Sequence, residues 1–212
     1  MNENIFRAYD IRGNAEQDLT PDVLVKIGFV LGNKVKDSGS DAIYVGHDSR
    51  LSCQRIFTDL CVGINSAGIK VLNLGLVPTP MVYYATNVGS TSHGAMITGS
   101  HNPKDDNGLK IVLDGGPVSG LDILNYVKKV ESCATSEADI DNISFEDQYI
   151  HEVVSKSSTS KKLKIILDSG NGAAGILAHK TFTALGHETI SINQEPDGNL
   201  SLIHISEPTR PF

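Results

Sequence analysis

The chain has 212 residues, of which 40% are hydrophobic and 20% are charged, and this composition excludes an intrinsically disordered protein. The formal net charge of -7 argues against nonspecific binding to nucleic acid or to an anionic membrane surface, so neither is expected as a partner. The sequence has no apolar run long enough to span a bilayer, no signal-peptide pattern, and three cysteines (Cys53, Cys61 and Cys133) without metal-ligand spacing, which together predict a cytoplasmic protein with reduced thiols.

Strand and helix patterns alternate along the first two-thirds of the chain. Thr20 and Pro21 form a helix start, a hydroxyl cap followed by proline at the first helical position, and the next apolar residues keep helical spacing. We therefore expect, in chain order, a helix from residue 21, a strand at 41–46, a helix at 53–67, a strand at 69–74, a stiff loop at 77–80, a short helix at 81–87, strands at 94–98 and 108–113, and a helix at 119–130.

The composition changes at residues 132–160, which are rich in Ser, Glu, Asp and Thr, with a helix expected around 145–157. The pattern then restarts with a strand at 163–167, a Gly-rich turn, a helix to about 185 and a strand at 188–193. These patterns predict an α/β fold: a mixed, mostly parallel sheet sandwiched by helices, repeated in two similar domains of which the second is incomplete. The expected divisions are domain 1 at 1–140, a linker at 141–160 and the start of domain 2 at 161–199.

The last residues, 200–212, do not continue this pattern. LSLIHISEPTR, residues 200–210, has no turn signals and no periodicity, and its codons can be written so that they spell the transposase adapter used in short-read library preparation. We therefore expect a non-native, adapter-derived tail on an N-terminal fragment of a longer protein. The alternative is a divergent C-terminal strand.

A polar loop of unusual composition, TGSHNP at 98–103, lies between two expected strands. Ligands of α/β sheets bind beyond the carboxyl ends of the strands, where this loop would lie. Ser100 offers a hydroxyl nucleophile, Gly99 leaves room for a substrate, and backbone amides in such a turn can bind an anion. Lys110, on the following strand, could reach back as a cation or a proton carrier. An ordinary polar loop remains the alternative reading.

Two other segments carry charged residues in places suited to a site. Arg7 and Arg12 flank Tyr9 and Asp10, and guanidinium groups suit phosphate, although a solvated arm would look the same. The segment 46–50 follows a strand, where His47 could be a ligand and Asp48 and Arg50 are more simply a local ion pair.

The Gly-rich turn at 170–175 matches G-x-G-x-x-G between a strand and a helix, and Glu195 lies about 20 residues further on, as in dinucleotide-binding domains. Against this reading, Asp168 would face the pyrophosphate. Small residues that let the helix pack close to the sheet are the other explanation. The dinucleotide reading would make the protein an oxidoreductase.

Taken together, the motifs resemble the α-D-phosphohexomutase family, most closely its bacterial phosphomannomutase/phosphoglucomutase branch. TGSHNP followed by NGLK is the most specific of them. The motifs are FRAYDIRG at 6–13, GHDSR at 46–50, VPTP at 77–80, TGSHNP at 98–103, NGLK at 107–110, DSGNGAAG at 168–175 and PDGN at 196–199. GHDSRLSC departs from the usual arginine- and glycine-rich version, which leaves the roles of His47, Ser49 and Cys53 open.

The resemblance implies a mutase that interconverts the 1-phosphate and 6-phosphate of mannose and/or glucose through a phosphoserine and a hexose 1,6-bisphosphate intermediate. It implies that Ser100 carries the phosphoryl group and that His101 and Lys110 are the acid–base residues. The sites implied for the phosphoserine or the sugar phosphate are Tyr9, Arg12 and Asn102.

The resemblance also implies Mg²⁺, bound through the phosphate of Ser100 with its remaining ligands absent from this chain. The family's aspartate-rich metal loop, its sugar-selecting loop and its C-terminal phosphate-binding loop would lie beyond Asn199, so the 212-residue chain is expected to be inactive alone. The alternatives left open are the dinucleotide-binding oxidoreductase, a catalytically silent phosphate-binding module and, weakly, a Ser-His hydrolase, since the sequence lacks G-x-S-x-G.

Overall fold

The structure is a computed structural model that describes residues 1–133, 138–157 and 161–199. The expected tail at 200–212 lies outside the described residues. The elements in chain order are η1 (Glu3–Ile5), β1 (Ile11–Asn14), α1 (Pro21–Asp37), β2 (Ala42–His47), α2 (Cys53–Ser66), β3 (Lys70–Leu76), α3 (Thr79–Val88), β4 (Gly94–Ile97), β5 (Asp106–Leu113), β6 (Gly116–Val118), α4 (Gly120–Val127), β7 (Ile140–Asn142), α5 (Glu146–Lys156), β8 (Lys164–Asp168), α6 (Gly175–Ala184) and β9 (Glu188–Ile192).

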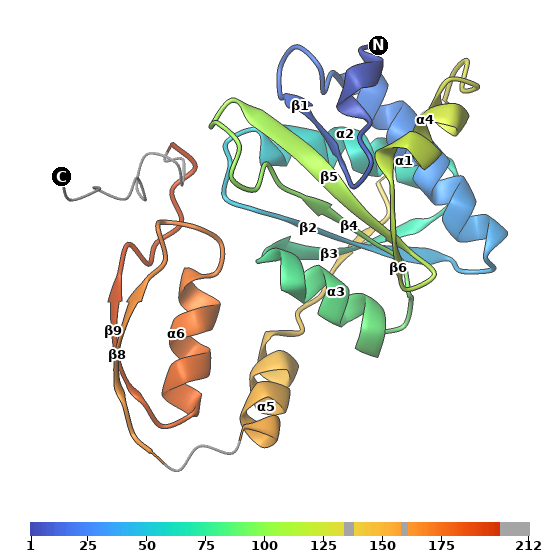
Figure 1. Cartoon of the computed structure of the whole chain (residues 1–212). Helices are drawn as coiled ribbons and strands as arrows, with labels where there is room; N and C mark the ends of the chain where they lie inside the picture. Colours follow the sequence, from blue (N-terminus) through green and yellow to red (C-terminus); the bar gives the residue numbers. More distant parts are fainter. Residues whose placement is uncertain (134–137, 158–160, 200–212) are drawn as a thin grey trace.

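The larger part of the molecule is built on a seven-stranded sheet in the order β1-β5-β4-β2-β3-β7, with β6 paired to β5 (Figure 1). Strands β4, β2, β3 and β7 pair in parallel with one another, in that order, whereas β5 pairs antiparallel with β1, β4 and β6. Strand β5 is therefore opposite in direction to every other described strand of this sheet. The expected mixed, mainly parallel sheet is therefore confirmed, and the carboxyl ends of its parallel strands meet at one edge.

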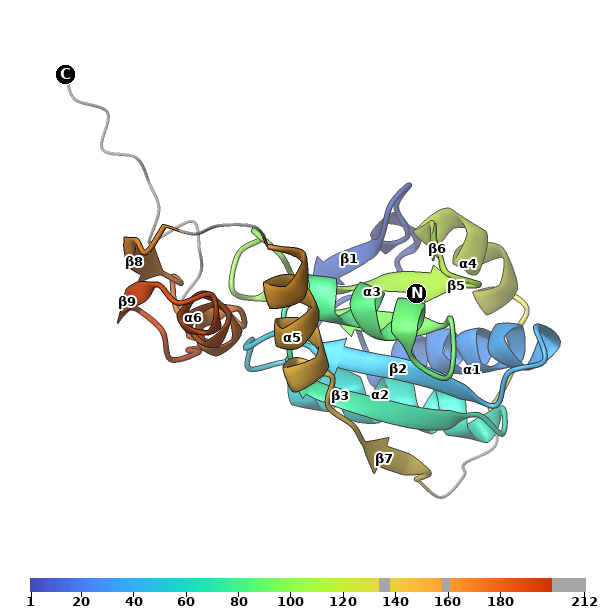
Figure 2. The same ribbon diagram turned by 90° about the horizontal axis from the view of Figure 1, so that it is seen from below.

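Helices cover both faces of this sheet (Figures 1 and 2). Because side chains alternate along a strand, Ile43 and Val45 of β2 join the larger core beneath α1, α2 and α4, while Tyr44 joins the smaller core beneath α3. The same alternation puts Met96 on the α3 side, and Lys110 lies opposite Met96 in the antiparallel register. Lys110 therefore belongs to the α3 face.

Helices α1 and α2 approach each other closely at two glycines. A Cβ atom on Gly28 would lie 2.2 Å from the carbonyl oxygen of Leu60, and one on Gly63 would lie 2.1 Å from that of Val25. Neither backbone can move aside cheaply, so these positions require glycine. The two closely packed helices cover one face of the sheet whose strand ends carry the loops described below.

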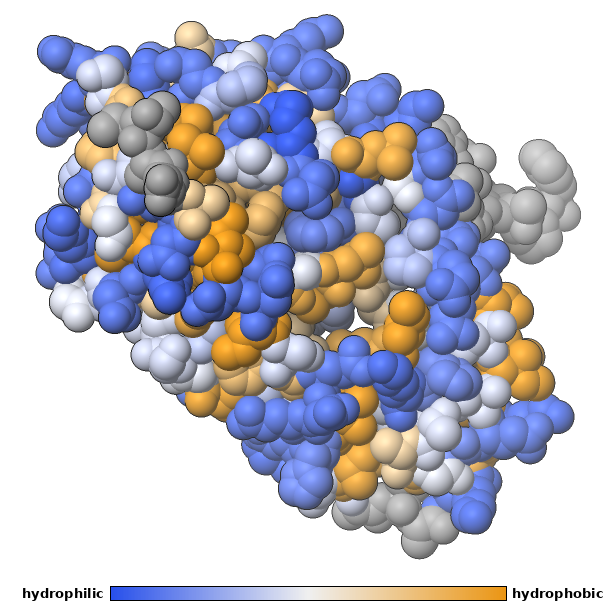
Figure 3. Space-filling view, turned by 180° about the vertical axis from the view of Figure 1, so that it is seen from behind, coloured by the Kyte–Doolittle hydropathy of each residue, from blue (hydrophilic) through white to orange (hydrophobic). Residues whose placement is uncertain are grey.

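A smaller unit follows residue 160 and consists of the parallel pair β8 and β9 with α6 on one face. Among its described residues only Gly175 is buried, and the other face of the pair exposes Ile166, Ile190 and Ile192. Figure 3 shows hydrophobic residues on the surface of both parts of the molecule. This second βαβ arrangement is the one that the sequence predicts, and one face of its strand pair is uncovered among the described residues.

Helix α5 lies between the two units (Figure 2). On one side it contacts α3, where the Tyr84 hydroxyl donates to Glu152 at 2.7 Å and the rings of Tyr84 and Tyr149 lie 5.1 Å apart. On the other side Glu146 pairs with Lys180 of α6. No described helix is long and apolar enough to cross a membrane.

Two local expectations need correction. The boundary expected at residue 140 falls inside β7, which pairs with β3 and extends the first sheet. The stiff loop expected at 77–80 is shorter, because α3 already begins at Thr79 with Pro80 in its first turn. Proline is accepted there because the first helical N–H groups have no intrahelical partner.

His93 is buried in the first unit and is the group from which we expect a pH-dependent stability. Its Nδ1 accepts the Asp114 N–H at 3.2 Å, so the ring proton sits on Nε2 and faces the Ser38 hydroxyl at 2.8 Å. Burial lowers the pKa of His93, and the Asp114 carboxylate opposes this only in part. The unfolded chain therefore binds a proton more readily than the folded chain below about pH 6.5.

We expect the free energy of unfolding to fall as the pH is lowered through about 6.5 towards the folded pKa, with a slope of at most about 1.4 kcal/mol per pH unit. Urea denaturation at several pH values between about 7.5 and 5.5 measures it. His93→Gln should flatten the dependence in this window. An unchanged slope in that variant would contradict the assignment to His93.

Candidate active site

Several loops meet at the carboxyl edge of the sheet and enclose a cavity of about 300 Å³. Its walls come from the ends of β2, β3 and β4 and from the Gly-rich turn of the second unit. The lining includes residues 48–50, 77–79, Ser100, His101 and 169–174. The serine predicted as a nucleophile thus opens onto a cavity shared by both units.

Ser100 lies in the loop between β4 and β5 and is exposed. Its backbone has φ of 51°, in the left-handed region that non-glycine residues rarely adopt. Its N–H donates to the Thr98 hydroxyl at 2.9 Å, and its own hydroxyl lies 3.4 Å from Nδ1 of His101. An exposed serine in this conformation needs surroundings that hold it there.

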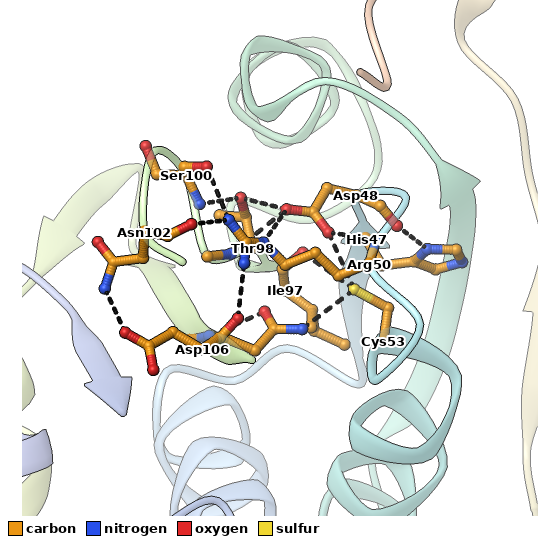
Figure 4. Close-up of polar contacts among 12 residues, drawn as sticks. His47, Asp48, Arg50, Cys53, Ile97, Thr98, Ser100, Asn102 and Asp106 are labelled. Carbon is orange, nitrogen blue, oxygen red and sulfur yellow. Dashed lines mark hydrogen bonds and ion pairs between the residues drawn. The ribbon is translucent and has the colours of Figure 1, made fainter. Parts of the chain in front are cut away.

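Arg50 supplies much of that support from beneath the loop (Figure 4). Its side chain is only 10% exposed, and its guanidinium donates to four backbone carbonyl oxygens. Two of these bonds run to Ser100 at 2.9 Å and Asn102 at 2.8 Å. The other two run to Pro103 and Asp106. The whole turn is therefore tied to one planar cation.

Asp48 is the acceptor at the centre of the same network (Figure 4). One carboxylate oxygen accepts from the Thr98 hydroxyl at 2.7 Å and from the Gly99 N–H at 3.3 Å, and it lies 3.5 Å from Nε of Arg50. The other accepts from the Arg50 N–H at 3.0 Å and from the Cys53 thiol at 3.1 Å. Burial, with the neighbouring Asp48 charge, raises the pKa of Cys53, so this cysteine acts as a neutral donor.

Gly99 has a different role from the one expected. A Cβ atom there would lie 2.3 Å from Cζ of Arg50, so the missing side chain makes room for the guanidinium and not for a substrate. The expectation that Gly99 leaves space for a ligand is corrected on this contact. The simple local ion pair expected between Asp48 and Arg50 is present, but it is a small part of what Arg50 does.

Arg12 and Lys110 flank the buried Asp10. Arg12 lies 3.4 Å from the Asp10 carboxylate and Lys110 lies 3.8 Å from it. Arg12 also donates to the Asn102 side chain at 2.8 Å, and Asn102 in turn donates to Asp106 at 3.0 Å. Among the described residues, Nε of Arg12 is buried without a hydrogen-bond partner. The structure thus joins Arg12 to the serine loop through Asn102.

The remaining predicted residues are less directly connected to the serine loop. Lys110 has Asp10 as its recorded ionic partner and shares the α3 face with Met96, which lines the cavity, but it does not line the cavity itself. Tyr9 is 87% exposed. His47 has Nδ1 against the Asp48 carbonyl at 2.8 Å and its ring against Phe57. The described residues contain no group of three or more His, Cys, Asp or Glu side chains that could hold a metal ion.

The Gly-rich turn of the second unit faces the serine loop across the cavity. Gly170 and Asn171 have φ of 51° and 56°. The Asp168 carboxylate accepts from the Asn193 side chain and from the Gly170 N–H, both at 3.0 Å, and these bonds lower the pKa of Asp168. The Asp168 carboxylate is therefore ionised and already accepts a hydrogen bond from one amide of the turn.

Comparison with known proteins gives consistent matches. A family model described as phosphoglucomutase/phosphomannomutase, alpha/beta/alpha domain I, matches residues 3–135. A phosphomannomutase/phosphoglucomutase of Pseudomonas syringae pv. tomato is 39% identical over 204 residues, which are 95% of this chain and 44% of that protein. A phosphoglucomutase of Neisseria gonorrhoeae is 34% identical over 215 residues, covering 100% of this chain and 46% of that protein.

Solved structures show the same fold. A phosphoglucomutase/phosphomannomutase family protein from Burkholderia thailandensis matches with a TM-score of 0.86 and 36% identity, over 94% of this chain and 46% of that one. A putative phosphomannomutase from Thermus thermophilus matches in fold, with a TM-score of 0.78 and 24% identity, over 95% of this chain and 47% of that one. The chain therefore spans about half the length of the relatives that it matches.

Proposed function

Because this chain belongs to the phosphoglucomutase/phosphomannomutase family, we propose that it is part of a phosphohexomutase whose Ser100 carries the phosphoryl group. The substrate class is a hexose phosphate, mannose and/or glucose, with a hexose 1,6-bisphosphate as intermediate. The observation that best supports the proposal is the geometry of Ser100. It is exposed on a shared cavity, in a left-handed conformation, on a loop held by Arg50 and Asp48.

The reaction consists of two phosphoryl transfers. In the first, the free hydroxyl of the sugar phosphate attacks phosphorus, the bond between phosphorus and Oγ of Ser100 breaks, the sugar hydroxyl loses its proton to a base and Oγ gains one. The bisphosphate then reorients, and Oγ attacks its other phosphorus to reverse these steps. Catalysis of such transfers is mainly positioning and stabilisation of the charge on the phosphoryl oxygens.

The proposed roles of the side chains follow from their places. We propose that His101 exchanges the proton of the Ser100 hydroxyl, which the 3.4 Å between its Nδ1 and Oγ of Ser100 supports. Lys110 on the α3 face is the proposed base for the sugar hydroxyl. Arg12 and Asn102 form one linked pair beside the loop, and the partly exposed guanidinium of Arg12 is the proposed cation for an anionic oxygen. Tyr9 is exposed and free to contact the sugar phosphate.

Mg²⁺ is proposed only for the longer protein. The ion needs oxygen ligands in octahedral geometry, and a phosphate on Ser100 would supply one. The described residues bring no cluster of carboxylates to that position, so they do not by themselves fit the ion. No step of the reaction is assigned to it.

A dinucleotide-binding oxidoreductase is the competing function. The Gly-rich turn does lie between a strand and a helix, but Asp168 is ionised there and takes the Gly170 N–H that a pyrophosphate would need. We therefore expect no saturable binding of NAD or NADP in a fluorescence titration. Tight binding of NAD or NADP that is lost in the Gly172→Asp variant would favour the oxidoreductase.

The mutase proposal is tested by single-turnover phosphorylation. Incubating the 212-residue chain with glucose or mannose 1,6-bisphosphate should add one phosphoryl group to the chain, measured by intact-protein mass. One event per chain suffices, so the measurement does not require repeated turnover. Ser100→Ala should gain none. A chain that gains no phosphoryl group under these conditions, or a Ser100→Ala variant that gains as much, would count against the proposed function.

A further inference from the structure

We infer that Arg50 is a positioning residue for phosphoryl transfer at Ser100. The inference rests on the proposed function of Ser100 and goes beyond it, because Arg50 would touch neither the sugar nor the transferring phosphoryl group. It would act on the loop from the opposite side, by fixing the direction of the peptide groups around the serine.

Four backbone carbonyl groups of the serine loop point toward the same side chain, the guanidinium of Arg50. The oxygens of Ser100, Asn102, Pro103 and Asp106 all point inward to the guanidinium. A trans peptide unit is planar, so its C=O and N–H point in opposite directions. The N–H of His101 therefore points away from Arg50, next to the exposed Ser100, and it has no recorded hydrogen-bond partner within the described residues. Such an amide is a donor for a phosphoryl oxygen on Ser100.

No other side chain could take the place of Arg50. Four carbonyl oxygens and Asp48 surround the group, which matches the planar, many-donor fork of a guanidinium and not the compact ammonium of lysine. Gly99 packs directly on the guanidinium, so the loop is shaped to fit it. The left-handed φ of Ser100 is the strained conformation that this fit maintains.

The backbone on both sides of Arg50 is itself fixed. The PDGN turn of the second unit packs there, since a Cβ atom on Gly198 would lie 2.3 Å from the Ser49 carbonyl oxygen and 2.9 Å from the Leu51 nitrogen. On its other side the segment is held by the bond from the Arg50 N–H to Asp48. A side chain can position a loop only if its own backbone is held in place, and these contacts hold the backbone of Arg50.

The experiment compares Arg50→Ala, Arg50→Lys and Arg55→Ala with the unmodified chain. Arg55 is the matched control: it is a partly buried arginine of α2 that donates to the carbonyls of Ala15 and Leu19 and makes none of the described hydrogen bonds to residues 98–103. Two quantities are measured: hydrogen exchange of the bonded amides of the loop, and the rate of Ser100 phosphorylation by a hexose 1,6-bisphosphate at saturating and limiting concentrations. The bonded amides are those of Gly99, Ser100, Asn102 and Asp106.

We expect exchange of these amides to rise at least about tenfold in both Arg50 variants and to stay unchanged, after correction for global stability, in Arg55→Ala. The saturated phosphorylation rate should fall about as far in Arg50→Lys as in Arg50→Ala, with little change in the half-saturating concentration. The lysine variant keeps the charge, so it also serves if the alanine variant does not fold.

Two results would overturn the inference. One is loop exchange in the Arg50 variants that rises no more than in Arg55→Ala. The other is a lysine variant with the wild-type rate and protection, which would assign the effect to charge alone. If the unmodified chain takes no phosphoryl group, the proposed function of Ser100 fails, whereas the exchange comparison still decides whether Arg50 sets the loop.

Discussion

Replacing Asp48 by alanine is expected to lower the free energy of unfolding by about 3 kcal/mol or more. The substitution removes the acceptor of five donors: the Thr98 hydroxyl, the N–H groups of Gly99 and Arg50, the Arg50 guanidinium and the Cys53 thiol. The Asp48 side chain is 17% exposed, so water replaces only part of what is lost. Removing one partner of a largely buried pair leaves the other partner unpaired. The stability lost in this way is far larger than the stability that the intact pair adds over two apolar side chains.

Asp59→Ala is the control for this prediction. Asp59 pairs with Arg55 at 3.3 Å, and its side chain is 18% exposed, close to the 17% of Asp48, but it makes this pair within one helix. We expect its loss to cost about 1 kcal/mol or less. Urea denaturation of the two variants measures the difference. Equal midpoints would show that the Asp48 network adds no more stability than an ordinary surface pair.

The 212-residue chain is expected to show no sustained mutase turnover, even though Ser100 can accept a phosphoryl group. The chain supplies the serine loop and the Gly-rich turn that faces it across the cavity, but it spans about half the length of its relatives. Orienting a bound sugar phosphate contributes up to about 7–11 kcal/mol in favourable reactions, and the described residues enclose the cavity only in part. Most of that contribution should be missing.

The assay uses the purified chain with Mg²⁺, glucose or mannose 1-phosphate and a trace of the 1,6-bisphosphate. We expect no 6-phosphate above the rate found with Ser100→Ala. The phosphorylation experiment is the positive control, because it shows that the loop is folded. Formation of 6-phosphate at an enzyme-like rate, abolished by Ser100→Ala, would show that the chain needs no further domain.

Much of the fold could be predicted because local signals and the global fold agree. Helix α1 begins at Pro21, where the sequence predicts it, although the Thr20 side chain makes no capping hydrogen bond. The apolar runs that become β2 and β4 reappear as buried strands of one sheet. The edge strand β7 could not be predicted, since Ile140–Asn142 lies in a polar stretch and has a single apolar residue. Its pairing depends on the exposed edge of β3, which a sequence pattern does not display.

The site was predictable in its residue types and less so in its contacts. The sequence predicts the serine loop as a candidate site, and the bond from Arg12 to Asn102 joins that loop to a segment that the sequence marks separately. The contacts of Arg50 could not be predicted, because its partners are backbone carbonyls 50 or more residues away and any residue type presents a carbonyl. The neighbouring Asp48 offered a simpler explanation. The nearest signal was Gly99, whose missing side chain makes room for the guanidinium.

The central claim, that Ser100 is the residue that carries the phosphoryl group, is tested most directly by locating that group. The chain is incubated with a hexose 1,6-bisphosphate, digested, and its peptides are fragmented in a mass spectrometer. We predict a phosphoryl group on Ser100 alone, although Ser49, Thr79, Thr98 and Ser169 line the same cavity. A phosphoryl group on any of those hydroxyls or on His101, with Ser100 unmodified, would contradict the claim.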